Sequence, residues 1–501
     1  MTAIITQKFR AHNAEQFFES FSEASSNAYY MMIGKATPFT SATSGGTDAS
    51  PPTPTDDVSN EYYLWDQTIA AKNIASGDVT YAVPRRDWQN SVVYDKYQDN
   101  VGASNLSQSG ATNLWDSTFF FRTSDNRVYK VMNNNGNVAY SGSEPTSEST
   151  SLFSQGGYIL KYMYTISASE QTKFLTTDFM PISTDSAVSA AAIDGAIVSL
   201  SVTSGTGYTD GTYYVAVNGD GTNAGTSSGA IVSFTVSSGA IQDFGLTSGT
   251  DTIVYAAGAL YTYGTVTLTD ATVFADAALS TAVDTGDINN GSGGAIGVFI
   301  SPKGGHGFDA VQELGGHYVM LNTLFIGAER DDLLTGNDFR NIAIVTDPTN
   351  YGTSTVASDQ TARQTYALKL TTVSGTFVND EKITQASTAA IGRVVEWDAT
   401  NTILYYQQER YTDYGTNSLG AYVAFSGANA VTGADSSAVG TPDSTADAAV
   451  TLANGFTITF SDGYVNPELQ PDSGNIIYTE NRSPISRATD QTEDIKIVVE
   501  F

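Results

Sequence analysis

Histidine and carboxylate side chains are the first residues in this chain whose types could do chemistry. There are three histidines, His12, His306 and His317, and the last two share one segment with Asp309 and Glu313. Imidazole and carboxylate groups are ligands for transition metals. The two histidines are 11 positions apart, however, and do not have the i, i+4 spacing of helical zinc motifs. A glycine-hinged loop whose polar groups cap neighbouring turns explains the segment more simply, so we predict no metal site.

Other patterns for catalysis or ligand binding are weak. The chain has no Cys, which excludes thiolate nucleophiles, disulfides and Cys-type zinc sites. It has no phosphate loop, and no nucleophile elbow between a strand and a helix. Residues 218–223 resemble part of a calcium loop but lack its bidentate Glu, and a hairpin turn explains them. We therefore predict no catalytic residues, no cofactor and no enzymatic activity.

A cluster of cations stands out in residues 83–88, Val-Pro-Arg-Arg-Asp-Trp. It places Arg85 and Arg86 beside Asp87 and Trp88, in a chain with only 23 Lys and Arg residues. Guanidinium groups pair with carboxylates in a bidentate manner and stack on aromatic rings. Two interpretations have equal weight: a clamp between subunits or domains, and an internal arrangement in which an Arg pairs with Asp87 or another nearby acid.

A second charged, turn-rich cluster precedes the C-terminal strand. It runs over residues 480–487 and continues in 490–494, and it includes Asn481, Arg482, Asp490 and Gln491. The alternative to an interface is a solvated connection between two strands.

The charge of the chain limits its partners. With 23 basic and 53 acidic residues, the formal net charge is −30, which repels phosphate groups. No apolar run approaches the roughly 20 residues that cross a bilayer, and the first ten residues lack the apolar core of a signal peptide. We predict no nucleic-acid partner, no membrane insertion and synthesis in a cytoplasm.

Strands dominate the elements that must position these clusters. Alternating or continuous apolar runs predict strands. A helical spacing of Val58, Tyr62, Trp65 and Ile69 predicts one helix, and the capping-box spacing of residues 13–16 predicts another. The predicted strands are 29–33, 79–83, 119–122, 127–130, 158–166, 339–345 and 495–501.

Two regions rich in small residues interrupt this pattern. Residues 195–205 recur as 229–239 with an offset of 34, and their period-2 pattern predicts short strands from duplicated hairpins. In the second region, residues 427–449 have the composition of a surface loop. The predicted fold is mainly β with a few helices: a layered β-sandwich core with two all-β insertions. Its segments are 1–185 (core, with two helical loops), 186–302 (insertion with the repeat), 303–363 (core), 364–460 (second insertion) and 461–501 (core, C-terminal strands).

Several of these motifs, in this order, resemble the dimeric baseplate wedge protein family of T-even-type contractile-tailed phages. The motifs are Ile5-Thr-Gln-Lys-Phe-Arg10 and Val83-Pro-Arg-Arg-Asp-Trp88, then residues 157–166, 339–348, 477–485 and 490–497. The resemblance covers residues 1–185, roughly 303–350 and 466–501. The two insertions have no recognisable counterpart in the shorter T-even member.

The resemblance implies a structural virion protein with a layered sandwich and no catalytic residues. It implies a homodimer that bridges other wedge proteins, takes part in baseplate rearrangement on tail contraction, and resides in the virion tail baseplate after synthesis in the host cytoplasm. The residues it suggests as interface or structural residues are Lys8, Phe9, Arg10, Arg85, Arg86, Asp87, Trp88, Asn481, Arg482, Asp490 and Gln491.

The alternative function is a host-surface or glycan-binding tail module carried by the insertions. Aromatic rings stack on sugars, but they also fill the cores of small β-domains. The tyrosines available for either role are Tyr208, Tyr213, Tyr214, Tyr261 and Tyr263.

Overall fold

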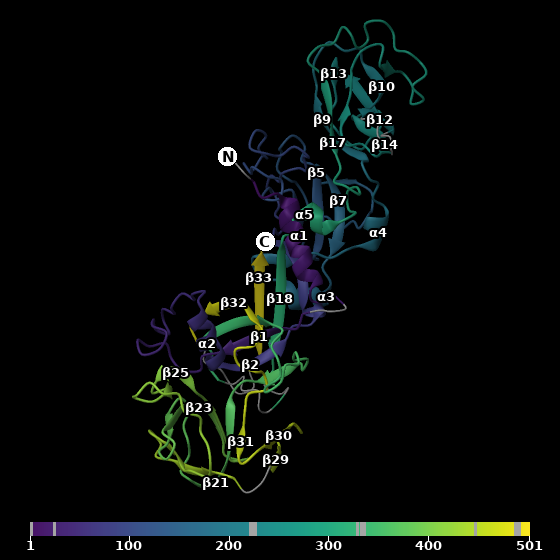
Figure 1. Cartoon of the computed structure of the whole chain (residues 1–501). Coiled ribbons are helices and arrows are strands. Elements are labelled where there is room, and N and C mark those ends of the chain that lie inside the picture. Colours follow the sequence, from purple (N-terminus) through teal and green to yellow (C-terminus); the bar gives the residue numbers. More distant parts are fainter. Residues whose placement is uncertain are drawn as a thin grey trace. The chain divides into compact units, whose positions relative to one another are not determined.

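The protein is built mainly of β-strands, as a computed structural model of residues 4–23, 27–219, 228–326, 330, 337–444, 448–484 and 492–501 shows (Figure 1). Strands hold 39% of the residues and helices 9%, which confirms the predicted mainly-β class. No helix among these residues is long and apolar enough to span a membrane.

The chain divides into two compact units. Unit 1 is Met1–Gln16, Thr80–Met320 and Val498–Phe501, and unit 2 is Phe17–Val79 and Leu321–Ile497. The predicted division into five segments, and the layering of the sandwich, remain predictions.

Unit 1 contains an antiparallel sheet with strand order β4-β5-β7-β6. The predicted hairpin forms because Asn126 adopts a left-handed conformation (φ 65°) at its turn, which Asn tolerates better than most residues. Both faces of this sheet are covered, so β7 is buried along almost its whole length. The strands are β4 (Phe120–Arg122), β5 (Arg127–Asn133), β6 (Phe153–Gln155) and β7 (Tyr158–Thr165).

The repeat region of unit 1 is made of short strands, but the two copies do not pair with each other. The first copy forms β9 (Ile197–Thr203), which pairs with β17 (Ala295–Ile300), and the second forms β12 (Ser228–Ser237). Alternating apolar residues specify a strand and its buried face but not its neighbour. The neighbours of β12 are β10 (Gly211–Ala216), β13 (Ala240–Ile241) and β14 (Ile253–Ala259), and β16 (Val273–Phe274) pairs with β10. A separate two-stranded pair is β11 (Asn218–Gly219) with β15 (Gly264–Thr265).

The predicted C-terminal strand is present and lies within a sheet. It is β33 (Glu493–Glu500), in a four-stranded sheet with order β33-β18-β3-β8. β33 is the end strand of this sheet, so β18 covers one of its two edges. The other three strands are β3 (Val79–Pro84), β8 (Phe179–Pro181) and β18 (Tyr318–Phe325).

Unit 2 contains a five-stranded antiparallel sheet with order β20-β2-β1-β19-β32. Two of the predicted strands, β1 and β19, lie side by side at its centre and are buried throughout, with Met31 opposite Ile344. The strands are β1 (Tyr29–Gly34), β2 (Thr68–Asn73), β19 (Asn341–Thr346), β20 (Thr361–Arg363) and β32 (Asn475–Asn481).

The second insertion supplies a sheet in unit 2 that closes on itself. Its order is β24-β23-β22-β27-β28-β21-β31, and β24 also pairs with β21. The prediction of a loop over 427–449 is wrong in part, because β27 and β28 lie there and bury Val431 and Ala438. The seven strands are β21 (Tyr366–Ser374), β22 (Lys382–Gln385), β23 (Ala390–Asp398), β24 (Ile403–Gln407), β27 (Val431–Gly433), β28 (Val439–Pro442) and β31 (Tyr464–Val465). Outside it lie β25 (Glu409–Thr412) with β26 (Gly415–Thr416), and β29 (Ala448–Thr451) with β30 (Thr457–Phe460).

The helices differ from the prediction mainly at the N-terminus. Helix α2 (Val58–Gln67) forms as expected, and the Asp57 side chain caps it by accepting from the Asn60 amide. Helix α1 (Gln7–Glu19) begins six residues before Asn13, so Asn13 lies inside the helix and does not cap it. Three short helices that periodicity did not reveal are α3 (Ala168–Phe174), α4 (Ser186–Ala190) and α5 (Ala310–Leu314).

Candidate functional site

The Arg-rich segment after β3 forms a network within its own chain. The Arg85 guanidinium donates to both Asp87 oxygens at 2.7–3.0 Å and to the Thr176 carbonyl at 2.7 Å. Arg122 of β4 donates to Asp87 Oδ1 from Nε at 2.9 Å. Burial would raise the pKa of Asp87, but hydrogen bonds from the two arginines outweigh it and hold that pKa below its ordinary value. One carboxylate therefore links two segments 35 residues apart.

Arg86 and Trp88 face the interior of unit 1. The Arg86 guanidinium lies 4.3 Å from the centre of the Phe120 ring and donates to the Trp115 carbonyl at 3.0 Å. Burial lowers the pKa of Arg86 to about 10. The Trp88 ring meets Tyr140 edge-on at 5.7 Å. These contacts are those of the internal interpretation, and a role in contacts between subunits remains a prediction.

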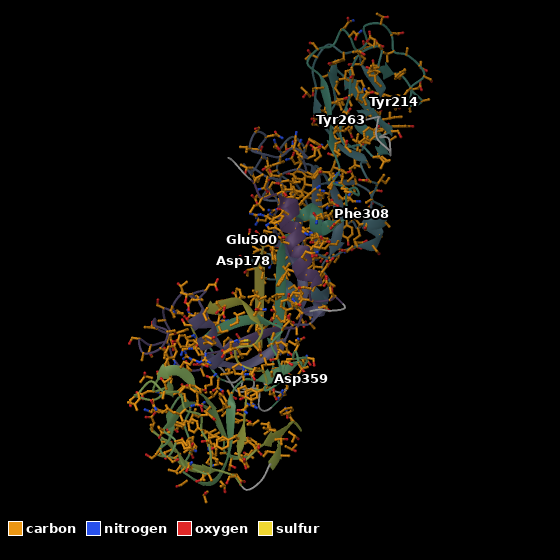
Figure 2. All side chains as sticks on the ribbon, in the orientation of Figure 1. Asp178, Tyr214, Tyr263, Phe308, Asp359 and Glu500 are labelled. Carbon is orange, nitrogen blue, oxygen red and sulfur yellow. The ribbon has the colours of Figure 1, made fainter. Side chains whose placement is uncertain are left out.

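The N-terminal motif residues lie on the first turn of α1. Arg10 is 3.4 Å from Glu500 at the end of β33, in a pair that is exposed to solvent. Gln7 Nε2 lies 2.7 Å from Nδ1 of His317, which is itself 3.8 Å from Glu500. Lys8 is exposed, and Phe9 exposes 55% of its surface. The first turn of α1 and the end of β33 thus meet beside His317. Glu500 is labelled in Figure 2.

The second predicted cluster is partly described. Asn481, at the end of β32, donates from its side chain to the Pro52 carbonyl at 3.0 Å. The Arg482 guanidinium lies 5.7 Å from the Phe339 ring centre, and its backbone amide donates to the Arg340 carbonyl at 2.8 Å. Asp490 and Gln491 lie outside the described residues.

A fully buried charge cluster in unit 1 was missed by the sequence analysis. Lys130 Nζ lies 2.8 Å from Glu313 Oε2 and 2.9 Å from His306 Nδ1, and 4.1 Å from the centre of the Tyr97 ring. The Gly307 amide also donates to Glu313 at 2.6 Å. The sequence feature that could have revealed this cluster is Lys130, a cation inside the otherwise apolar strand Val-Tyr-Lys-Val-Met.

Burial and charge set the protonation of this cluster. Burial lowers the pKa of His306 to about 4, and the charge of Lys130 adds to the effect, so the imidazole is neutral at pH 7. Burial would raise the pKa of Glu313, but Lys130 and His306 bring it to about 2. Lys130 therefore donates to a neutral imidazole and an ionised carboxylate.

The structure separates the four possible metal ligands of residues 303–317. His306 and Glu313 do come together, but the Lys130 ammonium lies between them. Asp309 instead caps α5, and His317 lies with Gln7. In the described part of the chain, no three His, Cys, Asp or Glu residues gather at metal-binding distance.

Unit 2 has a comparable buried pair. Lys35 Nζ donates to Glu409 Oε2 at 3.1 Å, and both side chains are inaccessible to solvent. Thr37 and Gln67 also donate to Glu409, at 2.8 and 2.9 Å. Every oxygen of this buried carboxylate is thus hydrogen-bonded, as burial of a charge requires.

The tyrosines of the first insertion differ in exposure. Tyr208, Tyr213 and Tyr261 are buried in the core of unit 1, which is the core-filling alternative of the two roles considered for them. Tyr263 exposes 53% of its surface. Tyr214 packs edge-on against the half-exposed Tyr255 at 5.3 Å.

The ion pairs described above link strands and loops within each unit, and the fold defines the class: a mainly β protein. The family described as Bacteriophage T4, Gp8 matches residues 3–143 and 447–501. This match at the two ends of the chain confirms the predicted resemblance to a T4-type baseplate wedge protein. The family supports a structural role in the tail baseplate, in contact with other baseplate proteins. No curated protein sequence matches the chain.

The match does not extend over all the motifs that suggested the resemblance. Residues 157–166 and 339–348 lie outside it. Yet β19, from the second of these segments, lies between β1 and β32, which both come from matched segments.

Proposed function

We propose that the chain is a non-enzymatic subunit of the phage tail baseplate wedge that forms a homodimer, bridges wedge proteins and changes its contacts on tail contraction. Synthesis in the host cytoplasm precedes assembly. The observation that carries this proposal is the Gp8 family match at both ends of the chain.

The mechanical part of the proposal is supported by how the matched segments are joined. β1 and β2 from one matched segment share a continuous sheet with β32 from the other, through β19. A continuous sheet transmits force between distant segments of the chain. Such a unit can move as a rigid body while its interfaces repack.

For the dimer, we propose that the N-terminal surface of unit 1 takes part. Ile4, Ile5 and Phe9 expose 86%, 65% and 55% of their surface, and Lys8 and Arg10 flank them. Apolar residues clustered on a surface and rimmed by charges are typical of protein interfaces. In this proposal the Arg85–Trp88 network has a structural role within unit 1.

Light scattering on the full-length protein tests the dimer. The expected mass is twice the 53.0 kDa of one chain. Phe9→Ser should weaken the dimer, whereas the matched control Phe308→Ser should not, since Phe308 has a similar exposure of 52% in the same unit. A monomer at micromolar concentration that also fails to join reconstituted wedges would reject the proposal.

A second candidate function rests on the tyrosines that remain accessible. Tyr255 and Tyr263, on the first insertion, expose about half of their surface, and Tyr214 packs against Tyr255, so these rings could stack on sugars. Tyr214 and Tyr263 are labelled in Figure 2. Tyr255→Ala combined with Tyr263→Ala should then abolish binding of the full-length protein to host cells. Unchanged binding, or none in the parent protein, would remove this candidate.

A further inference from the structure

A groove of about 460 Å³ lies within unit 2, beside the edge strand β32. Its walls are the loop after Ser44, helix α2 and β32, with Gln67 and Asn341 at their junction. Its lining includes Asp56, Asp57, Glu61, Tyr63, Tyr411 and Tyr478.

One wall of the groove is a free strand edge. β32 ends the five-stranded sheet and pairs only with β19 among the described strands. The pairing shifts register at Ile477, but Tyr478–Asn481 follow β19 regularly, opposite residues 341–344. An edge strand presents backbone N–H and C=O groups that can pair with another strand. Four regular residues are enough for a short added strand.

The other walls are held in place by contacts that a ligand need not provide. Tyr63 and Tyr411 stack at 4.5 Å with an interplanar angle of 18°. Gln67 is fixed between Glu409 and Asn341, and Asn481 ties the end of β32 to Pro52. A groove organised in advance loses less conformational entropy when it binds.

The charge of the lining selects among occupants. It contains three carboxylates, Asp56, Asp57 and Glu61, and no Lys, Arg or His. Opposite charge favours association and like charge opposes it. A second copy of this chain offers few cations for the groove, with 23 Lys and Arg against 53 Asp and Glu, and is disfavoured as the occupant of this site.

We propose that an extended, positively charged segment of a partner protein binds in this groove by adding a strand to the free edge of β32. Backbone hydrogen bonds to Tyr478–Asn481 provide affinity, and Lys or Arg side chains of the partner meet the three carboxylates. This surface shares no residue with the proposed dimer surface on α1, so either proposal can fail without the other.

Binding of short labelled peptides to the full-length protein tests the proposal. The probes are Lys-Val-Thr-Val-Lys-Val, its counterpart with Glu in place of Lys, and a basic version with Pro at the two central positions. Fluorescence anisotropy should show binding of the first peptide only, because Glu repels the groove and Pro cannot donate to a strand. Hydrogen exchange should slow at residues 478–481 when the basic peptide binds.

Variants separate this site from general attraction to an acidic protein. Asp56→Asn with Glu61→Gln should weaken basic-peptide binding by about tenfold. The matched double variant Asp178→Asn with Asp359→Asn removes the same charge from exposed residues outside the groove and should leave binding unchanged. Thr53→Lys, at an exposed position of the groove, should also weaken binding. Equal weakening by both double variants, equal binding of all three peptides, or no protection of β32 would overturn the proposal.

Discussion

Lys130 and Glu313 form an ion pair of 2.8 Å with essentially no exposed surface on either side chain. They are 183 residues apart in the sequence, and they join β5 to helix α5 inside unit 1. Two charges removed from water persist only when each is paired and hydrogen-bonded. The pair therefore specifies how these two segments pack.

Glu313→Gln should destabilise the protein by about 3–5 kcal/mol, because it leaves the Lys130 charge buried without its counter-ion. Replacing both residues, with Lys130→Met and Glu313→Gln, should cost less than Glu313→Gln alone. Urea denaturation followed by tryptophan fluorescence measures both. The control Lys382→Met removes a solvent-exposed pair with Asp413 and should change stability by about 1 kcal/mol or less. If Glu313→Gln lowers the free energy of unfolding by no more than this control does, the structural role of the pair is contradicted.

Acid should destabilise the native protein partly through His306. Its pKa is about 4 in the folded chain and 6.5 without burial, so between these values the unfolded chain binds the extra proton. The stability due to a neutral His306 is thus present above pH 6.5 and is lost as the pH falls towards 4. Asp66 has the opposite effect on stability. Burial raises its pKa to about 7, so the folded chain binds the extra proton and gains stability as the pH falls from 7 towards 3.8.

The His306 contribution is isolated by comparing the parent protein with His306→Gln. The difference in unfolding free energy between the two should shift in favour of the variant as the pH falls from 6.5 to 4. Denaturation curves at half-unit pH steps measure it. A difference that stays constant over this range would show that His306 does not resist protonation.

Reversing charge at Arg85 and Arg86 should impair folding or wedge assembly more than the same change in the second insertion. Arg85→Glu places a carboxylate against Asp87, and Arg86→Glu buries one against the Phe120 ring. The matched control is Lys382→Glu with Arg393→Glu, two partly exposed residues that lie opposite each other on β22 and β23. Wedge reconstitution and denaturation measure the effect, and equal tolerance at the two places would reject the prediction.

Gly156→Ala should be more costly than Gly110→Ala, although both glycines have positive φ (63° and 87°). A Cβ at Gly156 would collide with the buried Tyr140 ring, whereas nothing lies within 4 Å of one at Gly110. Both variants bear about 1 kcal/mol of backbone strain, and overpacking should add about 1–3 kcal/mol at Gly156 alone. Equal unfolding midpoints of the two variants would show that the Tyr140 ring can move away from the added Cβ without a measurable loss of stability.

Much of the local structure was predictable from the sequence. The apolar runs became β1, β7, β19 and β33, and the helical spacing after Asp57 became α2. Where composition conflicted with burial, the prediction failed: residues 431–433 and 439–442 looked like a loop but form strands of the closed sheet. Short helices such as α5 are set by a cap and its surroundings and offer too few turns for a periodic signal.

The amino-acid sequence by itself determined the mainly-β class, the positions of the longer strands and the resemblance of the two ends to the Gp8 family. Only the tertiary structure decided which strands are neighbours, that Arg85 and Arg122 share Asp87, and that Lys130 meets Glu313. Side-chain periodicity records the local conformation and the buried face of an element. Strand partners and ion pairs depend instead on contacts between residues far apart in the chain, which no local pattern specifies.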